Sequence, residues 1–363
     1  MTSRERIQRI MRHEIPDHVG IYDHYWGETL DRWRKEGMPA DVSPEDFFEH
    51  DIAFSCESVY DDSLRFEERM LEVKGDSIIR LNAYGVTEEV WLDRSRTGVA
   101  RVLDVTIKNL HDWEEHCHRL TPSLERLDPT YQERYRSARK KQRFLLLSFR
   151  CPWNLTWRMH GFENTLVDMA LAPDFIGRMF ADIMDFQLTM ISLLLKEGYE
   201  YDGIELRVDC ASRNGLLFSE QFYRDLLMPH HQQLCDFATG KNLPVIIDND
   251  GNMSALLPFH RQTGVRGLFP LEVKAGMDVR NLKKEYPQFV YCGNIDARVI
   301  SRSRAEIEEE IAGKVLIAKE GSGYIYHVDH SVPPDVSFED YVFALETVRR
   351  YGSYSSSAGQ NPD

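Results

Sequence analysis

The sequence predicts an α/β protein folded as a (β/α)8 barrel of the TIM type. Short apolar segments alternate with helical segments at least six times after Arg143, which indicates a parallel sheet. No glycine-rich phosphate-binding loop follows any of these segments, which argues against Rossmann and P-loop folds. The length of 363 residues suits one such barrel. We expect a single barrel domain over residues 1–352, with N-terminal helices and a β-meander added to it.

The N-terminal region predicts two helices and one strand. Thr2-x-x-Glu5 matches a capping box, so a short helix begins here and ends before Pro16. Residues 19–22 form a short apolar segment typical of a strand. Ser43-Pro44 starts another helix, with Ser at the N-cap and Pro at the first helical position.

Three further segments lie outside the alternating pattern. Residues 77–104 show alternating β-branched residues around Gly85 and Gly98, which predicts an antiparallel meander decorating the barrel. Residues 125–141 are rich in Arg, Lys and Glu, as on a solvated helical face. Residues 353–363 contain mainly Ser, Gly, Asn and Pro and are expected to form a disordered tail.

Short apolar segments after Arg143 predict six strands of the barrel. The predicted strands are residues 144–149, 203–208, 244–247, 267–270, 289–292 and 324–328. The helix after Pro173 repeats apolar residues at intervals of three or four, which gives it one buried face: Ile176, Phe180, Met184, Leu188, Ile191 and Leu195. Later helices begin at Ser303-x-x-Glu306, a capping box, and at Ser337.

Charge and composition exclude several classes of protein. With 44 basic and 59 acidic residues the net charge is −15, which disfavours binding to nucleic acid. No apolar run approaches the ~18 residues of a membrane span, and the polar start does not resemble a signal peptide. The six cysteines include no CxxC pair, which indicates reduced thiols and excludes a zinc ribbon. We expect a cytoplasmic protein.

Ionisable side chains follow nearly every predicted strand. In a (β/α)8 barrel the carboxyl ends of the strands surround one mouth, where the chemistry takes place. We therefore expect the following residues to converge there: Asp23, His24, Arg150, Cys151, Arg207, Asp209, Asp248, Asp250, Glu272, Asp296, His327, Asp329 and His330.

Strand alternation assigns further roles near this mouth. Tyr22, His24 and Trp26 share one parity and are predicted to form a wall that binds substrate. Glu205 and Arg207 also share a face, so Arg207 is the expected partner of the buried carboxylate, in a structural or substrate-positioning role.

The order of several motifs resembles the uroporphyrinogen decarboxylase superfamily, which also includes cobamide-linked methyltransferases. The resemblance covers about residues 2–352 and implies a (β/α)8 barrel. It rests on these motifs: Arg12-His-Glu-Ile-Pro-Asp17, Tyr25-Trp26, Gly161-Phe-Glu-Asn164, Asp202-Gly-Ile-Glu205, Asp248-Asn-Asp-Gly-Asn252, Pro270-Leu-Glu272, Cys292-Gly-Asn-Ile-Asp296 and Asp329-His-Ser-Val-Pro-Pro334.

Departures from the family patterns bear on activity. Uroporphyrinogen decarboxylases have an Arg-rich N-terminal loop that grips substrate carboxylates, whereas residues 23–28 here are acidic and aromatic. The methyltransferase branch binds zinc through His-x-Cys and a distant Cys. Those positions resemble Asp248, Asp250 and His330, so thiolates are absent from the expected ligand set. The resemblance implies a divalent ion, zinc first, and the alternative is a simple Asx-rich turn.

The leading hypothesis is metal-assisted methyl transfer from a small methylated substrate to a corrinoid protein or a thiol. Asp248, Asp250 and His330 would hold the ion, and Glu272 or Asp209 would handle the proton. Two alternatives stay open: decarboxylation of a small acid held by Arg150 or Arg207, and a non-catalytic barrel that binds a ligand or cobamide. The resemblance also implies a homodimer.

Overall fold

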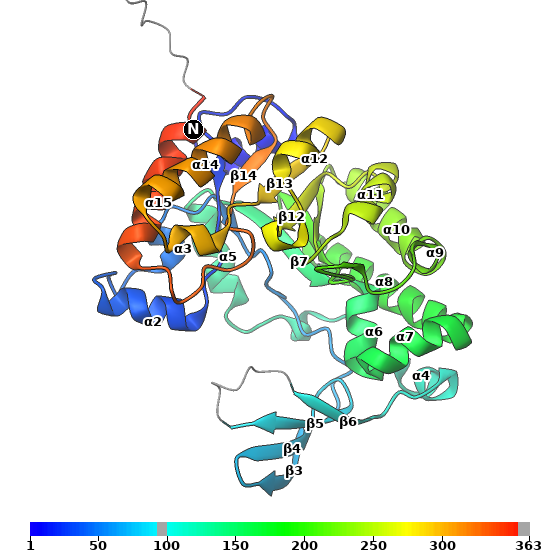
Figure 1. Cartoon of the computed structure of the whole chain (residues 1–363). Helices are drawn as coiled ribbons and strands as arrows, with labels where there is room; N and C mark the ends of the chain where they lie inside the picture. Colours follow the sequence, from blue (N-terminus) through cyan, green and yellow to red (C-terminus); the bar gives the residue numbers. More distant parts are fainter. Residues whose placement is uncertain (93–99, 355–363) are drawn as a thin grey trace, which may run out of the picture.

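A computed structural model describes residues 1–92 and 100–354 and confirms the predicted (β/α)8 barrel. Eight parallel strands form one sheet in the order β1-β14-β13-β12-β11-β8-β7-β2, and helices surround it (Figure 1). The strands are β1 Gly20–Ile21, β2 Ile52–Ala53, β7 Phe144–Arg150, β8 Gly203–Arg207, β11 Val245–Asp248, β12 Gly267–Leu271, β13 Val290–Gly293 and β14 Tyr324–Tyr326. Six of them match the predicted apolar segments after Arg143 to within two residues at either end.

The barrel closes between β1 and β2 through a single residue. The backbone N–H of Asp51 donates to the Ile21 carbonyl at 2.8 Å, and the Asp51 carboxylate accepts the Ile21 N–H at 2.8 Å. Strand β2 was not predicted, because two paired residues are too few to show alternation.

The helices begin where their caps predict. Both predicted capping boxes are present, at Thr2 and at Ser303. The α-helices of four or more residues are α1 Ser3–Met11, α2 Gly27–Lys35, α3 Pro44–Phe47, α4 Leu110–His116, α5 Tyr131–Lys140, α6 Pro152–His160, α7 Phe162–Leu171, α8 Pro173–Lys196, α10 Met228–Thr239, α11 Leu257–Thr263, α12 Val279–Glu285, α13 Ala297–Ile300, α14 Arg304–Ala318 and α15 Phe338–Gly352. In the described chain none is long and apolar enough to cross a membrane.

Helix α1 closes the amino-terminal end of the barrel. Ile7, Ile10 and Met11 pack with interior residues of the strands, among them Phe144 and Ile325, in one buried cluster. On the outside, α8 buries most of its predicted apolar face against the sheet, although Leu188 and Leu195 are only partly covered. The amino-terminal end of the barrel interior is therefore filled by side chains, and the open space lies at the carboxyl ends of the strands.

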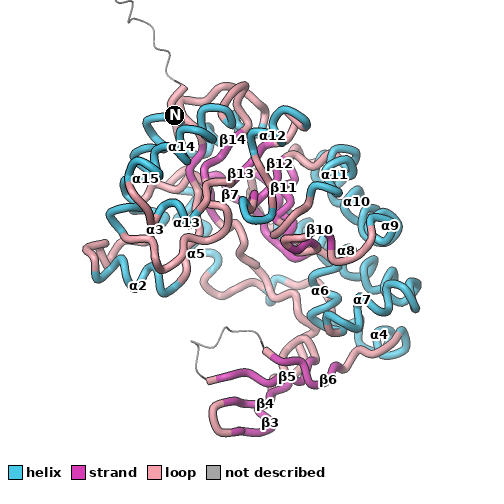
Figure 2. The backbone as a smooth tube through the Cα atoms, viewed as in Figure 1, coloured by secondary structure: helices cyan, strands magenta, loops and turns pink. Residues whose placement is uncertain are grey.

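The meander is a four-stranded antiparallel sheet, β3 Arg69–Lys74, β4 Ser77–Leu81, β5 Val86–Trp91 and β6 Arg101–Val105. It begins eight residues earlier than predicted, because β3 is exposed along its whole length and shows no buried face. Gly98 lies outside the described residues. Figures 1 and 2 show this sheet extending away from the barrel below α6 and α7.

Two predictions about exposed segments need correction. Tyr354 belongs to the expected disordered tail, yet its N–H donates to the Asp17 carbonyl and its hydroxyl to the Lys319 carbonyl. Residues 355–363 lie outside the described residues. Helix α5, expected to be a solvated face, buries Tyr131 completely beneath its charged side.

Candidate functional site

A cavity of about 380 Å³ opens at the carboxyl ends of the barrel strands. Side chains within or just after β1, β2, β8, β11, β12 and β14 line it. They are His24, Tyr25, Trp26, Cys56, Asp209, Asp248, Asp250, Phe269, Pro270, His327, His330 and Ser331. This is the position where barrels of this type carry their chemistry.

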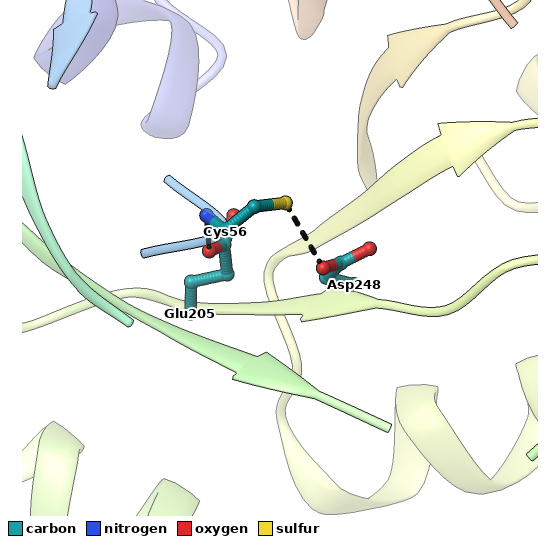
Figure 3. A group of neighbouring side chains, drawn as sticks. All are labelled: Cys56, Glu205 and Asp248. Atoms are coloured by element: carbon teal, nitrogen blue, oxygen red, sulfur yellow. Dashed lines mark hydrogen bonds between the residues drawn. The ribbon is translucent and has the colours of Figure 1, made fainter. Parts of the chain in front are cut away.

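At the inner end of the cavity, Cys56, Glu205 and Asp248 form a group of one thiol and two buried carboxylates, of which Cys56 and Asp248 line the cavity (Figure 3). The Cys56 thiol donates to Asp248 Oδ2 at 3.2 Å, and its backbone N–H donates to Glu205 Oε2 at 2.5 Å. Ser55 also donates its hydroxyl to Glu205. Burial raises the pKa of the Cys56 thiol and of both carboxyls, because removal from water disfavours the charged forms.

Asp250, Glu272 and His330 form a second, outer group, of which Asp250 and His330 line the cavity. His330 Nε2 lies 3.5 Å from Asp250 Oδ2, and hydrogen bonding to this carboxylate raises the pKa of His330. Burial raises the pKa of Glu272. The indole of Trp26 stacks on the His330 ring with centroids 6.1 Å apart. One potential ligand atom from each of the three residues lies within 4.8 Å of the others.

The predicted trio of Asp248, Asp250 and His330 therefore lines one cavity but divides between two groups. Glu272 joins Asp250 and His330, while Asp248 faces Cys56. Cys56, a residue that the sequence analysis did not place at the site, brings a thiol next to Asp248. Cys56 was missed because β2 was not recognised, although it follows the apolar run 52–54 just as other site residues follow their strands.

Asp209 is held in place at the end of β8. Its backbone adopts a left-handed conformation with φ of 47°. Oδ2 accepts from the Asn154 side chain at 2.7 Å, and the Asp209 carbonyl accepts from the Trp153 indole at 3.2 Å. Burial raises the pKa of Asp209, with a further contribution from the nearby Asp250.

Two members of the predicted aromatic wall line the cavity, and the third lies beneath it. His24 and Trp26 face the cavity, whereas Tyr22 is buried in the barrel and its hydroxyl lies 2.5 Å from His24 Nε2. Burial lowers the pKa of His24 to about 4, so the ring is neutral at pH 7. His327 Nε2 lies 3.3 Å from His24 Nδ1.

The two predicted carboxylate-binding arginines are occupied by protein groups. Arg150 forms an ion pair with Asp62 at 2.8 Å. Arg207 donates to the Cys56 carbonyl at 3.0 Å and to the Ser58 hydroxyl. The expected Glu205–Arg207 ion pair is not formed, since both side chains instead hold residues 55–58 in the described structure.

Comparison with known proteins identifies the family. A sequence profile of uroporphyrinogen decarboxylase (URO-D) matches residues 94–351. A methyltransferase from Methanosarcina mazei superposes with a TM-score of 0.64 at 15% identity, covering 96% of this chain and 98% of that chain, and so shares the fold. An endo-β-mannanase/endo-β-glucanase from Prevotella bryantii gives a TM-score of only 0.38 at 10% identity, covering 64% of this chain and 40% of the other. No curated protein sequence matches. The chain belongs to the uroporphyrinogen decarboxylase (URO-D) family.

Proposed function

We propose that this URO-D family member is a methyltransferase-type enzyme. It would move a methyl group from a small methylated substrate to a corrinoid, carried by a partner protein, or to a thiol. The observation that carries the proposal is the charge of the cavity: three carboxylates line it, and no Lys or Arg is among its described lining residues.

The same observation disfavours decarboxylation of a small acid. An anionic substrate needs a cation to hold its carboxylate, preferably an arginine. Arg150 and Arg207, the two candidates, are engaged by Asp62 and by residues 56–58. An acid would therefore meet the carboxylates of Asp248 and Asp250 without a partner of opposite charge. The fold similarity to a methyltransferase agrees with this choice.

The outer group fits a divalent metal. Asp250 and Glu272 offer carboxylate oxygens and His330 offers an imidazole nitrogen, a donor set that suits Zn²⁺ or a harder ion. Burial, and in addition the nearby Asp250, raises the pKa of Glu272, and a cation would relieve the repulsion between the two carboxylates. When bound, the ion would supply Lewis acidity to the heteroatom that carries the methyl group.

The remaining residues would position the substrate and move the proton. Asp209, whose orientation Asn154 fixes, would exchange a proton with the heteroatom that carries the methyl group. Trp26 and Phe269 would exclude water from the methyl group. The raised pKa of Cys56 keeps its thiol protonated and poorly nucleophilic, so an acceptor thiol would come from outside the chain.

Metal analysis and transfer assays test this proposal. Untagged protein should contain divalent metal. The protein should also demethylate methylcobalamin in the presence of a thiol, which is the reverse of methyl transfer from a small thioether to a corrinoid. Asp209→Asn should slow the transfer while metal content stays unchanged, because Asp209 is outside the outer group. Protein that lacks metal, transfers no methyl group and releases CO₂ from small acids would refute the proposal in favour of a decarboxylase. Protein that binds cobalamin but turns over neither substrate would indicate a non-catalytic barrel.

A further inference from the structure

The inner wall of the cavity carries a carboxylate with almost no partner. Asp248 is only 7% exposed, and the one hydrogen bond that its carboxylate receives from the described residues is from the Cys56 thiol, a weak donor. Oδ1 receives no hydrogen bond from the described residues. An ionised carboxylate this deeply buried is costly unless a positive charge accompanies it.

Asp209 extends the negative surface beside Asp248. It accepts one hydrogen bond, from the neutral side chain of Asn154. Arg207 and Arg158 lie close enough to lower the pKa of Asp209, but neither lines the cavity, and burial outweighs them. The carboxylates of Asp248 and Asp209 therefore face the cavity without an ammonium or guanidinium group from the described residues.

Aromatic rings form the rest of the wall. Phe269 lies against His24 with centroids 5.8 Å apart and against His327 at 4.8 Å. Trp26 is half exposed at the mouth, where it stacks on His330. Aromatic faces combined with carboxylates are the arrangement by which proteins recognise quaternary and protonated ammonium groups.

We infer that the cavity selects a small methylated molecule that carries an organic cation, with the positive charge held by Asp248 and Asp209 between aromatic rings. The volume of about 380 Å³ suits a ligand of this size. A metal bound by Asp250, Glu272 and His330 would leave the carboxylates of Asp248 and Asp209 free for the ligand. The inference rests on the proposed function for the fate of the ligand, but its test measures binding alone.

Choline and its neutral isostere 3,3-dimethyl-1-butanol provide the test, because they have nearly the same shape and differ in charge. Isothermal titration of metal-loaded and EDTA-treated protein should show choline binding at least about tenfold more tightly than the alcohol. Choline should also quench the fluorescence of Trp26, and Trp26→Phe should remove that change while retaining most of the binding.

Two isosteric variants and one control locate the charge. Asp248→Asn and Asp209→Asn should each remove most of the preference for choline over the alcohol. Asn keeps the shape of Asp248 and tolerates the left-handed backbone of Asp209. Glu197→Gln makes the same change in net charge at the far end of α8, at the exposed C-cap near the amino ends of the strands, and should leave both affinities unchanged.

The outcomes separate this inference from the proposed function. Equal affinities for choline and the alcohol, or no binding of choline to folded protein, would overturn cation selection, even if methyl transfer from a neutral substrate were observed. A preference for choline that survives both Asn variants would also overturn it. Selective choline binding without any methyl transfer would leave the inference standing and refute the proposed function.

Discussion

Replacement of Asp51 by alanine should destabilise the barrel where β1 meets β2. Asp51 is 1% exposed and joins the two strands through its backbone N–H and its carboxylate. The same carboxylate accepts from Arg6 Nη1 at 2.5 Å. Beyond these strands, the chain carries His24 and Trp26 on one side and Cys56 on the other to the cavity. The residue thus supports both the fold and the site.

The expected loss follows from the groups left behind. Asp51→Ala removes one of the two carboxylate partners of Arg6, and because Asp17 still pairs with Arg6 we take the lower end of the about 3–5 kcal/mol that breaking a buried ion pair costs. It also leaves the buried Ile21 N–H without its acceptor, a loss of about 1–3 kcal/mol when counted alone. The two effects share one carboxylate, so we expect a total decrease in the free energy of unfolding of about 4 kcal/mol.

Urea unfolding followed by circular dichroism measures this decrease. Asp17→Asn is the matched control, because Asp17 is the more exposed partner of the same Arg6 and its loss should cost no more than about 1 kcal/mol. If Asp51→Ala and Asp17→Asn lose equal stability, Asp51 does not close the barrel.

Four further predictions concern the site and its pH response. His330→Ala and Asp250→Asn should each lower metal affinity by about tenfold or more while the Tm of metal-free protein changes by less than about 3 °C; unchanged metal content would exclude the outer group. Gly251→Ala should destabilise the protein by about 1–3 kcal/mol and lower the metal affinity, because φ is +81° and the new Cβ would lie 2.6 Å from the Ser212 carbonyl; wild-type stability would disprove this. His50 has its pKa lowered to about 3 by burial, so between pH 6.5 and 3 only the unfolded chain takes up this proton; stability should therefore fall on acidification, and His50→Gln should flatten that fall in urea titrations at several pH values. Uroporphyrinogen should neither bind tightly nor be converted, because its many carboxylates would meet an acidic mouth; turnover to coproporphyrinogen would show otherwise.

Local signals in the sequence were sufficient for most of the barrel. The apolar runs before Arg150, Asp248 and Glu272 are buried strands, and the caps at Thr2 and Ser303 begin their helices as predicted. These features depend on neighbours within a few residues, so a single sequence reveals them. Strand β2 was not predicted, because its two residues are defined as a strand by pairing with β7, a contact between residues about ninety positions apart in the sequence.

The sequence by itself placed Asp209, Asp248, Asp250 and His330 at the carboxyl ends of strands, since each of those ends is set by its local pattern and the fold brings them together. Only the tertiary structure decided which of these side chains meet. It placed Glu272 with Asp250 and His330, and Cys56 with Asp248. It also paired Arg150 with Asp62 and Arg207 with the Cys56 carbonyl. Partner choice depends on the rotation and depth of side chains from strands far apart in sequence, and side-chain packing across the barrel fixes both.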